Sequence, residues 1–182
     1  MAFESAEKVL KAAIEYGGVF ATTDYDMGRK TALAPMGNDS QGKSPPQLYD
    51  PGNAAYGIAE AIEQKWIMMI PASGYVYDEF LQMNKPGTVG LHLVTQTGRE
   101  RLTEEKNQPR LIKAAEEAAV ELVKQIGGDQ FVLLSGCGFV DIPGANFPRE
   151  KLGLALAFAI FRGWIKVAGS KFVVTDTGHQ QH

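Results

Sequence analysis

Two stretches decide the fold: Val94-Thr95-Gln96-Thr97-Gly98 and Val174-Thr175-Asp176-Thr177-Gly178. They share the pattern Val-Thr-x-Thr-Gly, which the chain contains only at these two places. Each follows one of the two tryptophans, Trp66 and Trp164, and each tryptophan is followed directly by isoleucine. A segment that occurs twice in this order predicts a duplicated structural unit.

The residues before each tryptophan extend the repeat. Apolar helical runs cover residues 54–65 and 151–163, and an amphipathic helix that ends in Gly-Gly opens each half of the chain. A short apolar strand is expected after each Gly-Gly pair, at residues 18–23 and 131–134. We therefore predict an α+β fold made of two helix–strand–helix–hairpin units, residues 1–103 and 104–182.

The two units differ in their connections. The expected hairpin takes 28 positions from Trp66 to Val94 but 10 from Trp164 to Val174, so the hairpin at 66–95 carries a long flap at residues 71–90. The first unit also contains a loop, residues 24–53, that is rich in Gly, Pro, Asn and Ser. A loop of this length without helical or strand periodicity is uncommon in a compact domain and indicates a functional or mobile segment.

The run Leu152–Phe161 is apolar on nearly every side. A helix without a polar face is normally buried on several sides. It is therefore either the centre of the fold or covered in part by a partner.

The helix that ends in Trp-Ile, followed by a hairpin that returns through Thr-x-Thr-Gly, resembles the third helix and wing of winged-helix domains. The stretch Val94–Leu102 is similar to the strand that leaves a wing and enters a helix. The sequence departs from the family because neither loop between the first strand and the later helix, residues 24–53 and 137–147, offers a clear second helix. The resemblance implies a tandem winged-helix-like protein that binds double-stranded DNA.

In such a domain, the start of the third helix and the wing would contact phosphates. The cations at these positions of the second unit are Arg149, Lys151, Lys166 and Lys171, and Arg99 and Arg101 follow the first hairpin. The first half has 9 basic and 12 acidic residues, whereas the second half has 9 of each. The second unit is therefore the expected DNA-binding unit, unless these cations are ordinary solvated side chains.

The overall composition favours a soluble cytoplasmic protein. The chain has 182 residues, a net charge of −3 and one cysteine, so it lacks an internal disulfide and a generally basic surface. The N-terminal segment is acidic and amphipathic, unlike a secretory signal, and the longest apolar run is too short to span a membrane. No membrane association is expected.

Several residue patterns imitate catalytic or metal sites. Residues 37–44 match the phosphate-loop pattern G-x-x-x-x-G-K-[ST], but Pro45-Pro46 follow at once and oppose the helix that a nucleotide site needs. Cys137 has no evident activating base, and His179 with His182 is interpreted as a frayed polar tail. Asp24 and Asp26 are interpreted as solvated, so we expect neither a cofactor nor a metal.

Three hypotheses remain. The first is a non-enzymatic DNA-binding regulatory or assembly protein, forming a homodimer. The second is a protein–protein interaction module of the same architecture, favoured by the acidic first half and by Tyr75, Tyr77 and Phe80 on the flap. The third is an enzyme with a site in loop 24–53 or loop 136–147.

Overall fold

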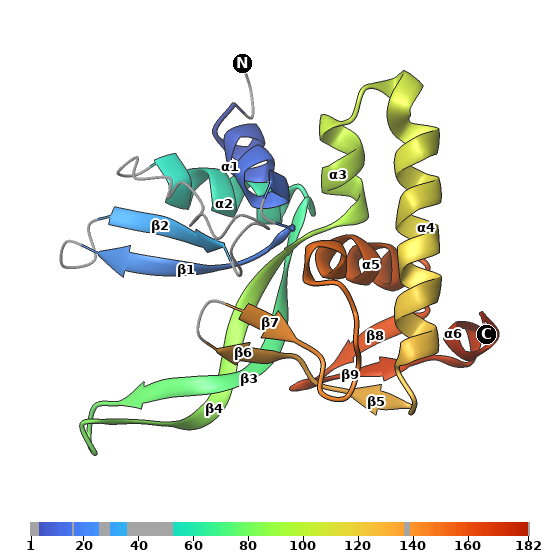
Figure 1. Ribbon diagram of the computed structural model, residues 1–182. Helices are drawn as coiled ribbons and strands as arrows, with labels where there is room; N and C mark the ends of the chain where they lie inside the picture. The colour runs from blue at the N-terminus through green and yellow to red at the C-terminus, as the bar shows by residue number, and fades with distance from the viewer. Residues whose placement is uncertain (1–3, 16, 26–29, 36–52, 137–138, 182) are drawn as a thin grey trace.

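The protein is α+β, which confirms the predicted fold class (Figure 1). The computed structural model describes residues 4–15, 17–25, 30–35, 53–136 and 139–181. The elements of the first half are α1 (Glu4–Glu15), β1 (Val19–Tyr25), β2 (Lys30–Pro35), α2 (Asn53–Glu63), β3 (Ile67–Asp78), β4 (Met83–Val94) and α3 (Gln96–Leu102). Those of the second half are η1 (Glu105–Asn107), α4 (Gln108–Gln125), β5 (Gln130–Phe131), β6 (Leu134–Gly136), β7 (Phe139–Asp141), α5 (Arg149–Phe161), β8 (Ile165–Ala168), β9 (Lys171–Val174) and α6 (Asp176–His179).

The backbone around the two tryptophans is the same in both halves. The Trp66 amide donates to Ala61 O at 2.8 Å, and the Trp164 amide donates to Ala159 O at 2.8 Å. The returning strand then closes on the tryptophan carbonyl, because the amides of Thr95 and Thr175 each donate to it at 2.9 Å. The end of each helix is thereby fixed to the end of its own hairpin.

Both Val-Thr-x-Thr-Gly strings form a helix N-cap. The hydroxyls of Thr95 and Thr175 accept from the amides of Gly98 and Gly178 at 3.1 and 3.2 Å. Each hydroxyl also donates 2.7 Å to a carbonyl, that of Lys65 or Gly163, just before the tryptophan. Threonine suits this position because its hydroxyl can accept a hydrogen bond from the first turn of the helix and donate another to a backbone carbonyl at the same time.

Two sheets form instead of one. A six-stranded sheet has the order β2-β1-β4-β3-β6-β7, and a three-stranded sheet has the order β5-β9-β8. The six-stranded sheet contains strands from both halves, joined by the parallel pairing of Ser73 with Leu134. The boundary at residues 103 and 104 therefore does not separate two unconnected bodies.

Three sequence expectations need correction. Part of loop 24–53 is the strand β2, which pairs antiparallel with β1 from Phe20–Pro35 to Tyr25–Lys30. The single strand expected at 131–134 is split between β5 and β6, and the expected loop 136–147 contains the strand β7, which pairs antiparallel with β6. Among the described residues, a strand hairpin thus occupies the place where a winged helix has its second helix.

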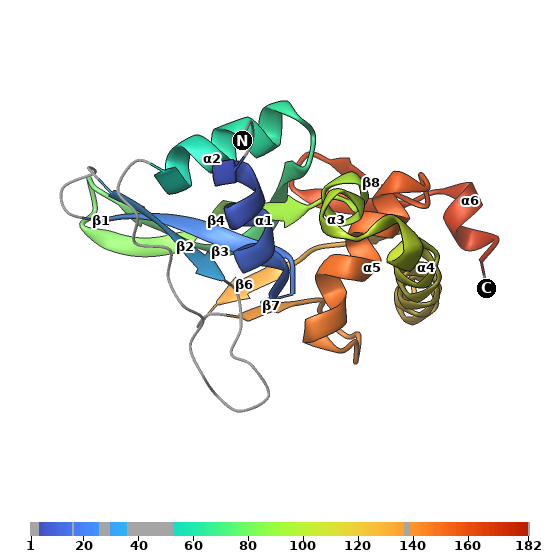
Figure 2. The same ribbon diagram turned by 90° about the horizontal axis from the view of Figure 1, so that it is seen from above.

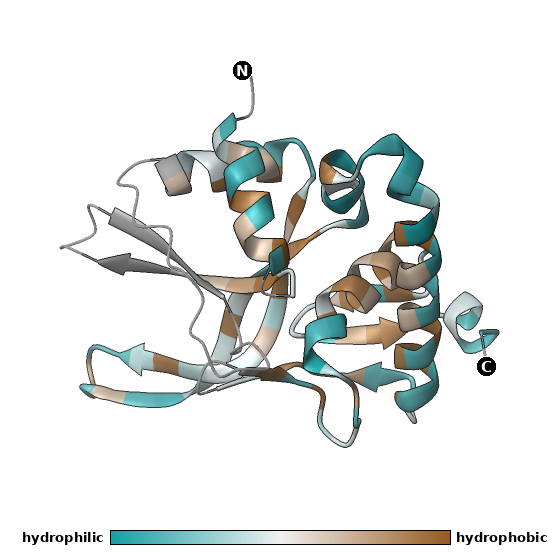
Figure 3. Cartoon of the chain, turned by 45° about the horizontal axis from the view of Figure 1, so that its top comes forward, coloured by the Kyte–Doolittle hydropathy of each residue, from teal (hydrophilic) through white to brown (hydrophobic). Residues whose placement is uncertain are grey.

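Helix α5 lies at the centre of the fold and is enclosed by both halves (Figures 1 and 2). It packs against α4 and β8 of its own half and against β4 and α3 of the first half. Every residue from Ala155 to Ala159 is buried. Figure 3 shows the apolar residues concentrated on α5 and the strands near it, with polar residues on the outer side of α4.

The main core therefore crosses between the two halves. It joins Val19, Ile70 and Leu93 of the first half with Leu122, Leu156 and Trp164 of the second. A smaller core belongs to the first half alone and contains Leu10, Phe20, Ile58 and Trp66. The close approach at Gly153 holds α5 against the end of α1, since a Cβ there would come under 3.0 Å from the carbonyl oxygen of Gly17.

No helix within the described residues is both long and apolar enough to pass through a membrane.

We predict that Gly98→Ala and Gly178→Ala each lower the free energy of unfolding by about 1–3 kcal/mol. A Cβ at either position would come under 3.0 Å from the backbone oxygen of the preceding tryptophan, Trp66 or Trp164, so backbone must move. Urea denaturation measures the loss. Gly127→Ala is the matched control, because a Cβ there meets nothing within 4 Å. Losses no larger than the control's would show that the close approach does not matter.

Candidate interaction surface

The four cations predicted for DNA contact in the second unit are all exposed. Arg149 and Lys151 lie in the first turn of α5, and Lys166 and Lys171 lie on β8 and β9. Lys171 pairs with Ala168, two residues after Lys166, so both lysines project from one face of the ribbon. Lys171 donates to Gln130 Oε1 at 2.5 Å.

The helix that should read DNA is covered along its length. Between Lys151 and Phe161, no residue of α5 is exposed, and most are fully buried. A recognition helix must present one face to the major groove. Only the ends of α5 remain for contact with a duplex.

Arg99 is not a surface residue, so its prediction as a DNA contact is corrected. Its exposed fraction is 6%, and its Nη2 donates to Gly17 O at 3.1 Å. Burial lowers the pKa of Arg99 to about 10, which leaves the guanidinium charged at neutral pH. Arg99 thus connects α3 to the end of α1.

Arg101, two residues further along α3, is exposed but already makes an ion pair and a cation–π contact. Its Nη2 lies 2.9 Å from Glu7 Oε1, and its guanidinium lies 5.5 Å from the ring centroid of Trp66. Both contacts hold α3 within the first half, against α1 and Trp66. Neither arginine of α3 is therefore presented as a simple phosphate ligand.

Exposed apolar side chains gather instead on the distal part of the β3–β4 ribbon. We call residues 74–87 the arm. Their exposed fractions are high: Phe80 95%, Tyr75 71%, Tyr77 61%, Leu81 56% and Met83 55%. Figure 1 shows the arm extending away from the rest of the molecule. These apolar side chains are exposed to solvent and do not belong to the hydrophobic core of the molecule.

The arm has a defined side-chain order. Tyr75 pairs with Pro86 and Tyr77 with Asn84, so both tyrosines lie on one face of the ribbon. Val76 lies on the opposite face, close to Gly87. The arm therefore presents an aromatic face and a separate tip at residues 79–82.

Asp78 organises the tip. Its Oδ1 accepts from the amides of Phe80 and Leu81, each at 3.0 Å, and its Oδ2 accepts from Lys85 across the ribbon. Gln82 completes the turn with a φ of 51°. Phe80 is thus presented by a structured turn at the end of the arm.

Helix α2 also carries exposed apolar side chains. Tyr56 is 63% exposed and Ile62 39% exposed. The charged residues Glu60 and Glu63 are on the same helix. An acidic and apolar helix suits a protein partner better than a duplex.

The described residues hold few groups suited to catalysis or metal binding. They contain no cluster of three or more His, Cys, Asp or Glu that could bind a metal ion. His92 is buried, stacks on Phe20 at 5.0 Å between centroids, and has a pKa lowered by burial, so it is a neutral core residue at pH 7. The phosphate-loop match at 37–44, the carboxylate of Asp26, Cys137 and His182 lie outside the described residues.

The C-terminal segment is more ordered than expected. The interpretation of His179 as part of a frayed tail is wrong, because residues 176–179 form α6. His179 Nε2 lies 3.1 Å from Asp129 Oδ1. This contact joins α6 to the start of β5.

No protein-family model, curated protein or solved structure matches this chain.

We predict that the turn at the tip loosens in acid as Asp78 is protonated. The Lys85 contact and the amides of Leu81 and Phe80 hold the pKa of Asp78 below 3.8, whereas the slight burial opposes this. Because the folded pKa is lowered, the stabilisation is complete above the unfolded pKa and is lost as pH falls through the folded pKa. Amide NMR shifts of Phe80 and Leu81 should therefore titrate below pH 3.8. Titration at or above that pH would contradict the capping role.

Proposed function

We propose that this protein is a non-enzymatic interaction module that binds a protein partner through the arm. The exposed aromatic and aliphatic side chains of the arm, Phe80 above all, carry the proposal. The largest exposed apolar patch of a monomer is often functional, and patches larger than a few hundred Å² mark interaction sites. Aromatic residues and methionine are also enriched at protein interfaces.

The order of the tip supports the same proposal. A flexible loop loses conformational entropy when binding orders it, and this loss lowers the affinity. Asp78 and Lys85 already fix the turn, so little further ordering is needed when Phe80 is buried. The two winged-helix-like units would then serve as the scaffold that holds the arm.

The arm itself is unsuited to DNA. Its charged residues are Asp78, Glu79 and Lys85, and Lys85 is already paired with Asp78. Glu79 leaves the tip acidic, and an acidic tip is repelled by phosphates. The extended wing of the first unit is therefore assigned to a protein contact.

DNA binding by the second unit is the other candidate, because Arg149, Lys151, Lys166 and Lys171 are exposed. With α5 covered, contact would be limited to phosphates and would carry little sequence information. Duplex binding that weakens steeply with salt and with Arg149→Ala/Lys151→Ala would favour this candidate over the interaction module.

We predict that a photo-crosslinking amino acid at position 80 forms a discrete protein adduct in cells that make the protein. Phe80 would lie at the centre of the interface, so the adduct should be lost on adding Tyr75→Asp and Tyr77→Asp, which remove the aromatic face. Mass spectrometry identifies the attached chain. Position 161 is the matched control, since Phe161 is 59% exposed but lies at the end of α5. Equal labelling at both positions would reject the arm as the contact surface.

A further inference from the structure

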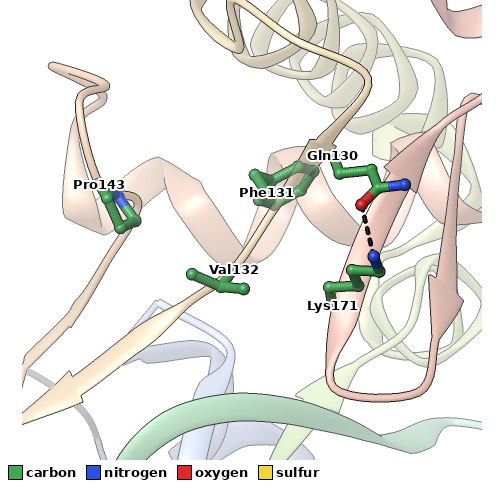
Figure 4. A pocket seen from close by; sticks show the side chains of 5 residues that line it. All are labelled: Gln130, Phe131, Val132, Pro143 and Lys171. Atoms are coloured by element: carbon green, nitrogen blue, oxygen red, sulfur yellow. Dashed lines mark hydrogen bonds between the residues drawn. The ribbon is translucent and has the colours of Figure 1, made fainter.

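We propose that the arm binds a second copy of this chain, with Phe80 of each copy seated in a pocket on the other. This inference rests on the proposed function and names the partner. The pocket lies where β5 meets the loop after β7, and it is lined by Gln130, Phe131, Val132, Pro143 and Lys171 (Figure 4). The chain thus carries both an exposed aromatic tip and a place that accepts one.

The pocket fits one aromatic side chain. Its volume is about 330 Å³, at the small end of the roughly 300–1,000 Å³ of ligand pockets. Figure 4 shows that Phe131, Val132 and Pro143 provide an apolar lining on one side and that Lys171 lies on the other. Phe131 also stacks on Phe172 at 5.0 Å between centroids, which fixes the wall that the incoming ring would contact.

The charges at the two surfaces are complementary. Glu79 is exposed beside Phe80, and its carboxylate is not used in the turn, which Asp78 organises. Lys171 is exposed at the edge of the pocket, where its contact is with the neutral amide of Gln130. With Phe80 in the pocket, Glu79 of one copy would face Lys171 of the other.

A second pocket, of about 350 Å³, fits the tip less well. It is lined by both charge types, with Lys11 and Glu15 at its surface and Arg99 below, together with Ile14, Leu102, Thr103 and Leu111. Glu15 would lie near Glu79 and oppose the docking of an acidic tip, although Lys11 offsets this in part. The lining of the pocket at Phe131 holds Lys171 and no carboxylate, so this pocket is taken as the receptor.

The arm cannot reach this pocket on its own chain. Figure 1 shows the free end of the β3–β4 ribbon on the opposite side of the molecule from β5. The part of β3 that lies in the arm, Gly74 to Asp78, projects on the order of 17 Å, which lets the tip contact a neighbouring copy. Exchange of two arms about a twofold axis gives a closed dimer that leaves neither tip free.

The area involved is that of a stable dimer. A buried aromatic side chain contributes roughly 150–250 Å². The three aromatic residues on each of two arms, together with the surface that they cover, reach the ~1,200–2,000 Å² of a standard interface. The exposed Leu81 at the tip would add to it.

The test is the oligomeric state of the full chain by sedimentation equilibrium. We expect a dimer, and Phe80→Ser should raise its dissociation constant by at least about 100-fold because two central contacts are lost. Glu79→Lys and Lys171→Glu should each weaken it by about tenfold or more, since like charges would then meet. The double variant Glu79→Lys/Lys171→Glu should restore dimerisation. Phe161→Ser, at an exposed phenylalanine outside the arm, should leave it unchanged.

Other results would overturn the inference. A wild-type chain that stays monomeric at about 100 μM, or a Phe80→Ser variant that remains a dimer, excludes arm exchange. Failure of the double charge reversal to restore the dimer excludes this pocket as the receptor. If position 80 then crosslinks to a different protein, the second-copy inference fails while the proposed function stands. If position 80 gives no adduct, both fail.

Discussion

The structure depends on the enclosure of α5. A helix with apolar side chains all round its circumference is stable only when surrounded, and one unit of this size cannot surround it alone. The second half supplies α4 and the β8–β9 ribbon on one part of its surface, while β4 and α3 of the first half cover another part. The two repeats are therefore held together by a shared helix, and the exposed aromatic residues of the arm lie outside this shared core.

The duplication preserves backbone geometry more than side-chain environment. The cap at Thr95 is reproduced at Thr175, and the contact of Thr95 with Lys65 O is reproduced by that of Thr175 with Gly163 O, at 2.7 Å in both halves. The tryptophans themselves have different neighbours, because Arg101 lies over Trp66 whereas Phe158 packs edge-on to Trp164 at 5.7 Å. Hydrogen bonds between fixed groups tolerate little change in geometry. A buried indole ring, in contrast, can be packed equally well by several different kinds of side chain.

Much of this fold could be predicted from local patterns. The four long helices α1, α2, α4 and α5 and the two hairpins follow from apolar periodicity and from Gly-Gly ends, and the structure places β3 and β4 within the predicted 66–95. The short strands β2, β6 and β7 could not be predicted, because their pairing partners decide them; β6, for example, pairs with Ser73 on the distant β3. Arg99 was misassigned for a related reason. A charged residue beside a hairpin looks solvated until the end of α1 and Gly153 are seen to surround it. The aromatic residues of the flap were recognised in the sequence, but the pocket that fits them joins Phe131 to Pro143 only in three dimensions.

The most direct measurement uses the two tryptophans as separate reporters of the two halves. Trp66→Phe leaves Trp164 as the only indole, and Trp164→Phe leaves Trp66. Urea unfolding of each variant is followed by tryptophan fluorescence and by far-ultraviolet circular dichroism. Because α5 belongs to a core that both halves share, the two signals should coincide within each variant, as expected for one cooperative unit. A fluorescence transition separated from the loss of helix in either variant would show that the halves unfold independently, and would contradict this account.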